Sequence, residues 1–261
     1  MQYLAPYQSG LWLAEYLNRR CQLCHIHRST PQAFEYDQRL FSNRLAHKFN
    51  SGLLCSHCHD SIAWQPPSFT VDIATSTSLS IQSATYYDYP IRQAIRAFKH
   101  HEDMTKLPLL IYVLRQLPRP KGCHSGNSVI LPMPTTSSRL IKRGFDPVTV
   151  LSVYLSKHWQ IPLWHGMQRV DSASSQQGLT RSERLTNLND AFVMTDIPPV
   201  KRILLFDDVA TTGASLQALA HTLYDQVKHA PNLSYSIDIP TTSSTVYHLS
   251  AYTLAHGSFD K

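Results

Sequence analysis

The chain carries two short continuous runs of apolar residues, and each run predicts a strand that is buried on both faces. The first run lies within Val129–Pro134, and the second is Ile203–Phe206. Each is followed, after a polar connection, by apolar residues at helical spacing, in Pro147–Lys157 and in Leu216–Val227. Buried strands that alternate with helices predict an α/β fold, in which a parallel sheet is flanked by helices.

Further stretches of periodic apolar residues extend this pattern. Residues Tyr89–Leu117 have helical spacing and predict one or two helices with a break at Pro108. Phe69–Ile73 and Leu79–Tyr87 alternate in the manner of edge strands, and residues 246–254 predict a strand near the end of the chain.

The chemistry changes abruptly where the second apolar run ends. Asp207 and Asp208 follow Phe206 directly, and a turn of small and hydroxyl-bearing residues separates them from the next helix. Such a turn lets backbone N–H groups approach a phosphate, and the positive end of the helix dipole favours the anion. The carboxylates would repel a phosphate, but they suit the hydroxyls of an attached sugar or a divalent cation. The pattern therefore predicts a ribose 5-phosphate site, and the simpler alternative is an ordinary helix N-cap. The predicted phosphate ligands are Ala210, Thr211, Thr212, Gly213, Ala214 and Ser215.

A cluster of cations follows the first apolar run. Arg139, Lys142 and Arg143 lie with Gly144 in a segment that we interpret as a loop. Concentrated cations beside a glycine suit a polyanion such as pyrophosphate, and a solvated basic surface loop is the alternative. Lys99, in the sequence Lys-His-His, has two readings of its own: a solvated helix end, or a side chain that faces the ligand.

The segment 170–192 is polar and shows no core pattern. Arg181, Arg184 and Asn187 offer hydrogen-bond donors there, so that the segment could close over a charged sugar as a lid. A disordered surface loop is the alternative interpretation.

Four cysteines form two Cys-x-x-Cys pairs that are separated by thirty residues, namely Cys21, Cys24, Cys55 and Cys58. Two such turns supply four thiolates for a tetrahedral Zn²⁺ ion, which would be structural because no coordination position is left open. Residues Ala33–Phe49, between the pairs, have helical spacing. A histidine follows each pair, as in c-type haem attachment, but that alternative and disulfide bonding both require an exported chain.

The composition of the chain and its Pro-rich stretch predict a domain boundary and a cellular compartment. The 261 residues suit one large domain with a small module, and a Pro-, Ser- and Thr-rich stretch at Trp64–Ser83 predicts the boundary. We expect a zinc module over residues 1–68 and a main domain over residues 69–261. No apolar run is long enough to cross a bilayer, the N-terminus does not resemble a signal peptide, and we expect a cytoplasmic protein. The formal charge of +6 is compatible with anionic ligands or nucleic acid.

Several blocks of sequence together resemble the ComF family. The segment LLFDDVATTGAS by itself resembles the signature of the type I phosphoribosyltransferases. The blocks occur in the family's order and cover nearly the whole chain: the two cysteine pairs, IRQAIRAFKH after Tyr86-Tyr87, LPMP with RLIKRGFD, QQGLTRSERLTNLNDAF, LLFDDVATTGAS and the terminal YTLAHG.

This resemblance implies a zinc-ribbon-like module fused to a type I phosphoribosyltransferase-like domain. It implies phosphoribosyl pyrophosphate, with Mg²⁺, as the ligand, and Asp207 and Asp208 as the catalytic pair. It also implies a part in DNA uptake during natural transformation, with single-stranded DNA and a DNA-translocating ATPase as partners. The alternative is a non-catalytic module that keeps the fold and binds DNA or the uptake motor.

Overall fold

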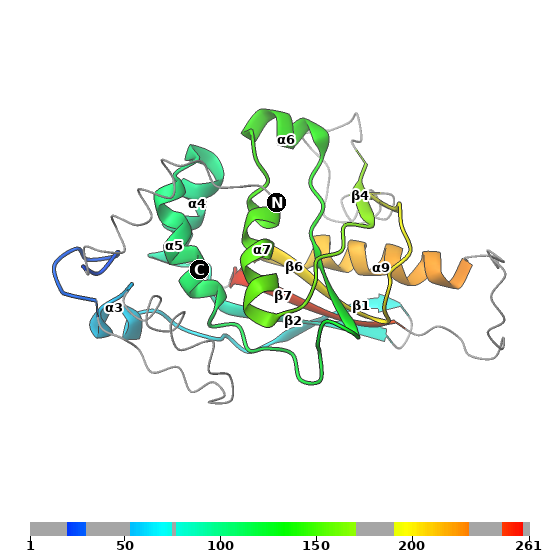
Figure 1. The fold of residues 1–261 in the computed structure, drawn as a ribbon, viewed down its shortest axis with the longest axis horizontal. Coiled ribbons are helices and arrows are strands. Elements are labelled where there is room, and N and C mark those ends of the chain that lie inside the picture. The colour runs from blue at the N-terminus through cyan, green and yellow to red at the C-terminus, as the bar shows by residue number, and fades with distance from the viewer. Residues whose placement is uncertain (1–19, 30–52, 75–76, 171–190, 230–246, 258–261) are drawn as a thin grey trace.

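A mostly parallel sheet forms the centre of the protein. The computed structural model describes residues 20–29, 53–74, 77–170, 191–229 and 247–257. In this part of the chain, five strands form the central sheet in the order β1-β2-β7-β6-β3 (Figure 1). Only β1 is antiparallel to its neighbour. The predicted α/β fold class is confirmed. The five strands are β1 (Phe69–Ala74), β2 (Thr77–Tyr86), β3 (Ser128–Pro132), β6 (Arg202–Ala210) and β7 (His248–His256).

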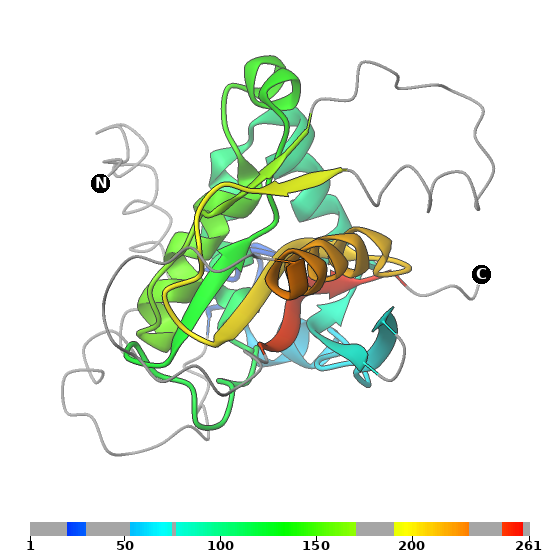
Figure 2. The same cartoon turned by 90° about the vertical axis from the view of Figure 1, so that its right-hand side faces the viewer.

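Helices cover both faces of this sheet, as the buried apolar run of β6 requires. On one face lie α5 (Leu107–Leu114) and α7 (Pro147–Trp159), and Trp159 packs edge-on against Tyr252 of β7 with ring centroids 4.9 Å apart. Helix α9 (Ala214–His229) packs against β1 and β6, and Figure 2 shows α7 and α9 on opposite sides of the sheet. The run Ile203–Phe206 is buried on both faces, as its sequence predicts.

Two predictions are wrong: the edge position of β2 and the place of the helical break. Strand β2 lies inside the sheet between β1 and β7, so only β1 is an edge strand of the predicted pair. The helical break lies before Pro108: α4 (Ile91–His101) ends at Glu102, and a short 3₁₀ turn, η1 (Met104–Lys106), leads into α5. Pro108 itself sits in the first turn of α5, where its missing N–H breaks no helical hydrogen bond.

Three shorter elements complete the described chain, and none of them was predicted. A two-stranded ribbon is formed by β4 (Met167–Arg169) and β5 (Phe192–Met194), and α6 (Ser137–Arg143) follows β3. The short helix α3 (Ser56–Asp60) begins directly after Cys55. The helix predicted over Ala33–Phe49 lies outside the described residues.

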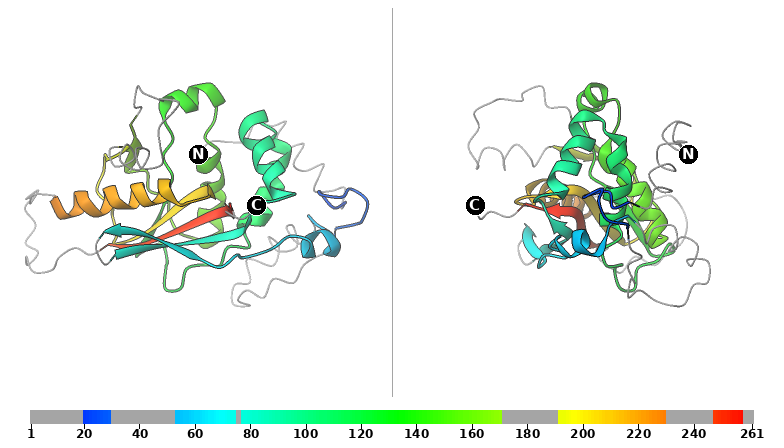
Figure 3. Two further views of the ribbon diagram at one scale, coloured as in Figure 1. Left: turned by 180° about the vertical axis from the view of Figure 1, so that it is seen from behind. Right: turned by 90° about the vertical axis from the view of Figure 1, so that its left-hand side faces the viewer.

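The cysteine-bearing segment packs against the end of the sheet that carries α5 (Figure 3). A hydrogen bond of 2.7 Å joins Tyr112 Oη of α5 to His59 Nδ1, and Trp64 Nε1 donates to the carbonyl of His59. Buried residues of both segments belong to one continuous core. The division into domains at residue 68 stays a prediction. Within the described residues, every helix is too short or too polar to cross a bilayer.

Candidate functional site: an acidic pair ringed by cations, and a four-cysteine cluster

The acidic pair stands at the carboxyl end of β6, where ligands bind in open α/β sheets. Side chains alternate along a strand, so Asp207 and Asp208 leave β6 on opposite faces. Asp208 is buried and Asp207 is half-buried. Burial, helped by the charge of Asp208, raises the pKa of Asp207 to about 8. Each carboxyl group therefore lies within electrostatic reach of the other, and burial disfavours the charged form of Asp207.

Lys99 forms an ion pair with this carboxylate floor. Its Nζ lies 2.7 Å from Oδ2 of Asp208, and the side chains are 23% and 4% exposed, respectively. The preceding residue, Phe98, is buried against Phe145 and anchors the end of α4. Lys99 therefore faces the site, and the alternative of a solvated helix end is wrong.

The turn between β6 and α9 brings its backbone close to the neighbouring strands. Gly213 has a φ of +75°, and a Cβ there would lie 2.7 Å from Cδ1 of Ile81. Only glycine fits both constraints. The N–H of Ala214 donates to Oγ1 of Thr212 (3.2 Å), which is the capping role that the sequence left open. The turn is thus tight and capped, and α9 starts directly from it, with Thr211 exposed beside the strand ends.

The predicted pyrophosphate loop is a short helix. Arg139, Lys142 and Arg143 lie in α6, which Thr136 caps by accepting the N–H of Arg139 and which Gly144 ends with a φ of +71°. The correction has a local cause, because a hydroxyl N-cap and a C′ glycine bracket a segment of helix-forming side chains. Arg139 and Lys142 point to solvent, and Arg143 is half-buried.

Two further basic residues, Arg169 and His100, are not predicted as ligands from the sequence. Arg169 forms a cationic wall together with Lys99 and the cations of α6, and His100 lies beside it. Burial lowers the pKa of Arg169 in β4; the charge of Arg139 acts in the same direction, and Asp207 opposes it. Burial also lowers the pKa of His100, helped by the charge of Arg143 and then by that of Lys99. Arg169 therefore lies near Asp207 and Arg139, whereas His100 lies near Arg143 and Lys99. No local pattern marks them, because they come from elements far apart in the sequence.

A third residue that the sequence does not predict, His256, stands at the end of β7 beside the turn between β6 and α9. Its ring stacks on Phe69 with centroids 4.4 Å apart, and Ala210 is its partner in the strand register. Burial lowers the pKa of His256, while a hydrogen bond to the backbone of Thr211 opposes this shift. The predicted lid residues Arg181, Arg184 and Asn187 lie outside the described residues.

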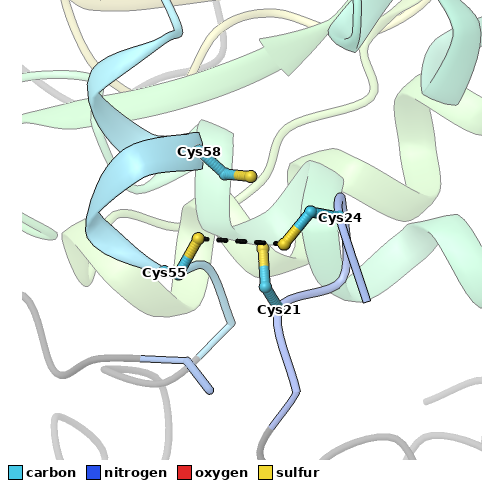
Figure 4. A group of neighbouring side chains, drawn as sticks. All are labelled: Cys21, Cys24, Cys55 and Cys58. Atoms are coloured by element: carbon cyan, nitrogen blue, oxygen red, sulfur yellow. Dashed lines mark hydrogen bonds between the residues drawn. The ribbon is translucent and has the colours of Figure 1, made fainter. Parts of the chain in front are cut away.

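The four predicted metal ligands come together. All four sulfur atoms lie within 4.8 Å of one another, and Sγ of Cys24 is 3.9 Å from Sγ of Cys55 (Figure 4). Tetrahedral coordination with Zn–S bonds of about 2.3 Å would place the sulfurs about 3.8 Å apart. The cluster therefore fits a zinc ion.

Local backbone structure shapes both halves of this cluster. In the first turn, the N–H of Cys21 donates to the carbonyl of His27, and His25 adopts a left-handed φ of +56°. Hydrogen bonds from the backbone of His27 and then Ile26 lower the pKa of Cys24 to about 6. Burial raises the pKa of Cys55 and of Cys58. The cluster thus combines one readily ionised thiol with thiols that need a cation to be charged.

Comparison with known proteins adds one curated relative. No protein-family model matches the chain. A protein of Haemophilus influenzae named Competence protein F is 32% identical over 146 residues, which cover 53% of this chain and 63% of that protein. The match thus spans less than two thirds of the relative, and it confirms the resemblance inferred from the sequence blocks. A solved structure of the Helicobacter pylori xanthine-guanine-hypoxanthine phosphoribosyltransferase aligns with 66% of this chain and 86% of its own at 18% identity, with a TM-score of 0.25.

Proposed function

We propose that this protein is a ComF-type competence protein whose main domain, residues 69–261, binds phosphoribosyl pyrophosphate or a related sugar phosphate in the cytoplasm. One observation carries the proposal: an acidic pair with a buried member, Asp208, and a tight small-residue turn meet at the carboxyl end of β6, beside cations from α4, α6 and β4. An acidic floor suits sugar hydroxyls, and a cationic wall suits phosphates. A phosphorylated sugar needs both.

Each part of the site has a role in this proposal. The turn 210–215 holds the 5-phosphate with backbone N–H groups at the start of α9. Asp207 and Asp208 accept hydrogen bonds from the ribose hydroxyls and favour the positive charge that develops on the sugar. The segment Arg139–Gly144 holds the diphosphate, and Mg²⁺ neutralises part of its charge. The lid, with Arg181, Arg184 and Asn187, closes over the ligand and excludes water.

Isothermal titration calorimetry with phosphoribosyl pyrophosphate and Mg²⁺ tests the proposal. We expect binding by the wild type and its loss in the double variant Asp207→Asn, Asp208→Asn. The matched control is Asp225→Asn, which removes a carboxylate from a surface pair with His221 on α9. Circular dichroism confirms that all variants are folded. Equal affinity in the wild type and the double variant would exclude this site.

Turnover is a separate question from binding. If the site is active, the reaction is phosphoribosyl transfer with release of pyrophosphate, and its catalysis is mainly positioning and electrostatic. A screen of nucleobases and ammonia for pyrophosphate release identifies the acceptor. The same double variant supplies the background rate.

A second candidate function is a non-catalytic module that binds single-stranded DNA or a DNA-translocating ATPase. The supporting observation is a group of basic residues from α4 and α6, in which the charges of Arg143 and Arg96 lie close enough to His100 to lower its pKa. Filter binding with single-stranded DNA over a salt series tests it, since phosphate contacts weaken steeply with salt. No binding at low salt would exclude direct contact with DNA.

The N-terminal module, residues 1–68 in this proposal, holds one structural zinc ion through Cys21, Cys24, Cys55 and Cys58. The chemistry of the donor set favours zinc, because four thiolates at tetrahedral spacing match it closely. The ion stabilises the charged form of thiols that burial would otherwise keep protonated.

A further inference from the structure

We propose that Lys99 is the built-in counter-cation of the Asp207–Asp208 pair: it holds the place that a free divalent cation would take and releases it only to an anionic, phosphorylated ligand. The part of this inference that concerns the ligand rests on the proposed function. The part that concerns the cation stands on the geometry of the Lys99–Asp208 ion pair alone.

The ion pair between Lys99 and Asp208 is short, and its carboxylate is buried. Nζ of Lys99 lies 2.7 Å from Oδ2 of Asp208, and that carboxylate is almost entirely removed from water. Among the described atoms, Oδ2 accepts no well-aligned hydrogen bond, so the ammonium group is its principal compensation. A buried carboxylate without a partner is costly, and the ammonium group of Lys99 is the partner that offsets this cost.

The position of Lys99 is fixed by packing rather than by the ion pair alone. Phe98, next to it, is 1% exposed and packs edge-on against Phe145 at 5.2 Å between ring centroids. Helix α4 ends three residues after Lys99, at Glu102, which has left-handed backbone angles. The ammonium group is thus held at the acidic pair from a rigid helix end, which makes it an effective competitor for any incoming cation.

The surroundings reinforce this competition. Arg169 lies within electrostatic range of Asp207, and His100 lies near Arg143 and Lys99. A free divalent cation approaching the acidic pair therefore meets the positive charge of Arg169 and a carboxylate that Lys99 already occupies. A cation that arrives already bound to a diphosphate brings its own negative charge, and the same wall attracts it.

Exchange of partners follows from this arrangement. When sugar hydroxyls or a ligand-bound cation reach Asp208, the ammonium group of Lys99 is free to turn toward the phosphate groups. Lys99 would then contribute to ligand affinity, although without the ligand it is paired with Asp208. The order of events is thus ligand and metal together, not metal first.

Titration with Mn²⁺ alone, followed by electron paramagnetic resonance of the free ion, tests the inference. We expect weak binding by the wild type and at least about tenfold tighter binding in Lys99→Met, because one repelling unit charge is removed within a few ångström of the cation. Lys99→Gln keeps a polar side chain beside Asp208 and serves as the second variant if Lys99→Met does not fold. Lys99→Arg keeps the charge and should keep the weak affinity.

Lys106→Met is the matched control. It removes a lysine a short distance along the chain, where Nζ of Lys106 faces Asp103 at 3.7 Å on the surface. An equal gain of Mn²⁺ affinity in this variant would show a general charge effect and overturn the inference. So would unchanged affinity in the neutral Lys99 variants, or a gain that survives when Asp207→Asn and Asp208→Asn are added.

A second arm uses phosphoribosyl pyrophosphate with Mg²⁺. We expect Lys99→Gln to weaken this binding by about tenfold, in line with loss of one charge-assisted contact, and Lys99→Arg to retain most of it. If the wild type does not bind the ligand, the proposed function fails, while the Mn²⁺ titration still decides the role of Lys99. Tighter ligand binding in Lys99→Gln would overturn the exchange of partners.

Discussion

The four-cysteine cluster and the acidic site at the end of β6 are assembled in opposite ways. Each cysteine pair lies in one local turn, and two such turns complete the cluster. The acidic site has a local floor, Asp207 and Asp208, but its walls come from α4, α6 and β4, which precede it in the chain by tens of residues. A site made of turns can be recognised from spacing, whereas a site made of meeting elements needs the fold.

The two regions also differ in how they balance charge. Burial raises the pKa values of Cys55 and Cys58, so the cluster needs an external cation before all its thiols can ionise. The acidic pair already has a cation of its own, Lys99. We therefore expect the stability of the cysteine cluster to depend on a bound metal, and that of the acidic pair not to.

Loss of two cysteines should destabilise the protein more than any other change predicted here, because it removes the proposed metal. Cys55→Ser with Cys58→Ser should remove the bound metal and lower Tm by more than about 10 °C, because a structural zinc ion contributes most of the folding energy of such a module. The loss should spread, since these cysteines belong to the same core as α5. Elemental analysis and differential scanning calorimetry measure both changes.

Cys123→Ser is the control for the cysteine variants. Cys123 is half-buried and lies outside the cluster, with Nη1 of Arg202 4.0 Å from its sulfur. It should keep the metal and change Tm little. Wild-type protein that contains no metal, or a double variant as stable as the wild type, would contradict the difference between the two regions.

The same contrast explains how much could be predicted from the sequence. The burial of the run Ile203–Phe206 and the clustering of the two Cys-x-x-Cys pairs can be predicted, because each pattern is complete within a few residues. The pairing of Lys99 with Asp208 could not be decided, since it joins residues more than a hundred positions apart. Arg169 was missed for the same reason: β4 pairs with β5 across residues 171–190, and nothing local marks the arginine.

Smaller misses had local causes that the patterns did not resolve. The cations and glycine of segment 139–144 favour a ligand-binding loop, although Thr136 and Gly144 are ordinary residues for the start and the end of a helix. The placement of β2 inside the sheet depends on its partner β7, near the end of the chain. Strand order is a property of the whole fold and is not written in one strand.

A smaller loss of stability is expected from a substitution at Gly213, in the turn between β6 and α9. Gly213→Ala should lower the free energy of unfolding by roughly 2 to 3 kcal/mol, because it adds a left-handed backbone penalty to a Cβ clash. That Cβ would lie 2.7 Å from Ile81 and 3.1 Å from Val71. Urea denaturation at constant m-value measures the change.

Gly144→Ala separates the two causes. Gly144 has nearly the same φ, +71°, but no atom lies within 4 Å of its added Cβ. It should therefore cost only about 1 kcal/mol, which is the backbone penalty alone. Equal losses in the two variants would show that the turn is not packed tightly against β1 and β2.

Asp207 of the acidic pair should cause a small fall in stability between neutral and alkaline pH. The pKa of Asp207 is raised to about 8, so the folded protein holds a proton that the unfolded chain loses near pH 4. This contribution is fully present below the unfolded pKa and is lost as pH rises through about 8. Tm of the metal-loaded, ligand-free protein should therefore fall by a few degrees between pH 7 and pH 9. The described histidines with lowered pKa values titrate below this window, namely His59, His100 and His256. Asp207→Asn should flatten the profile over the same range, whereas a slope equal to that of the wild type would assign the alkaline loss to other groups.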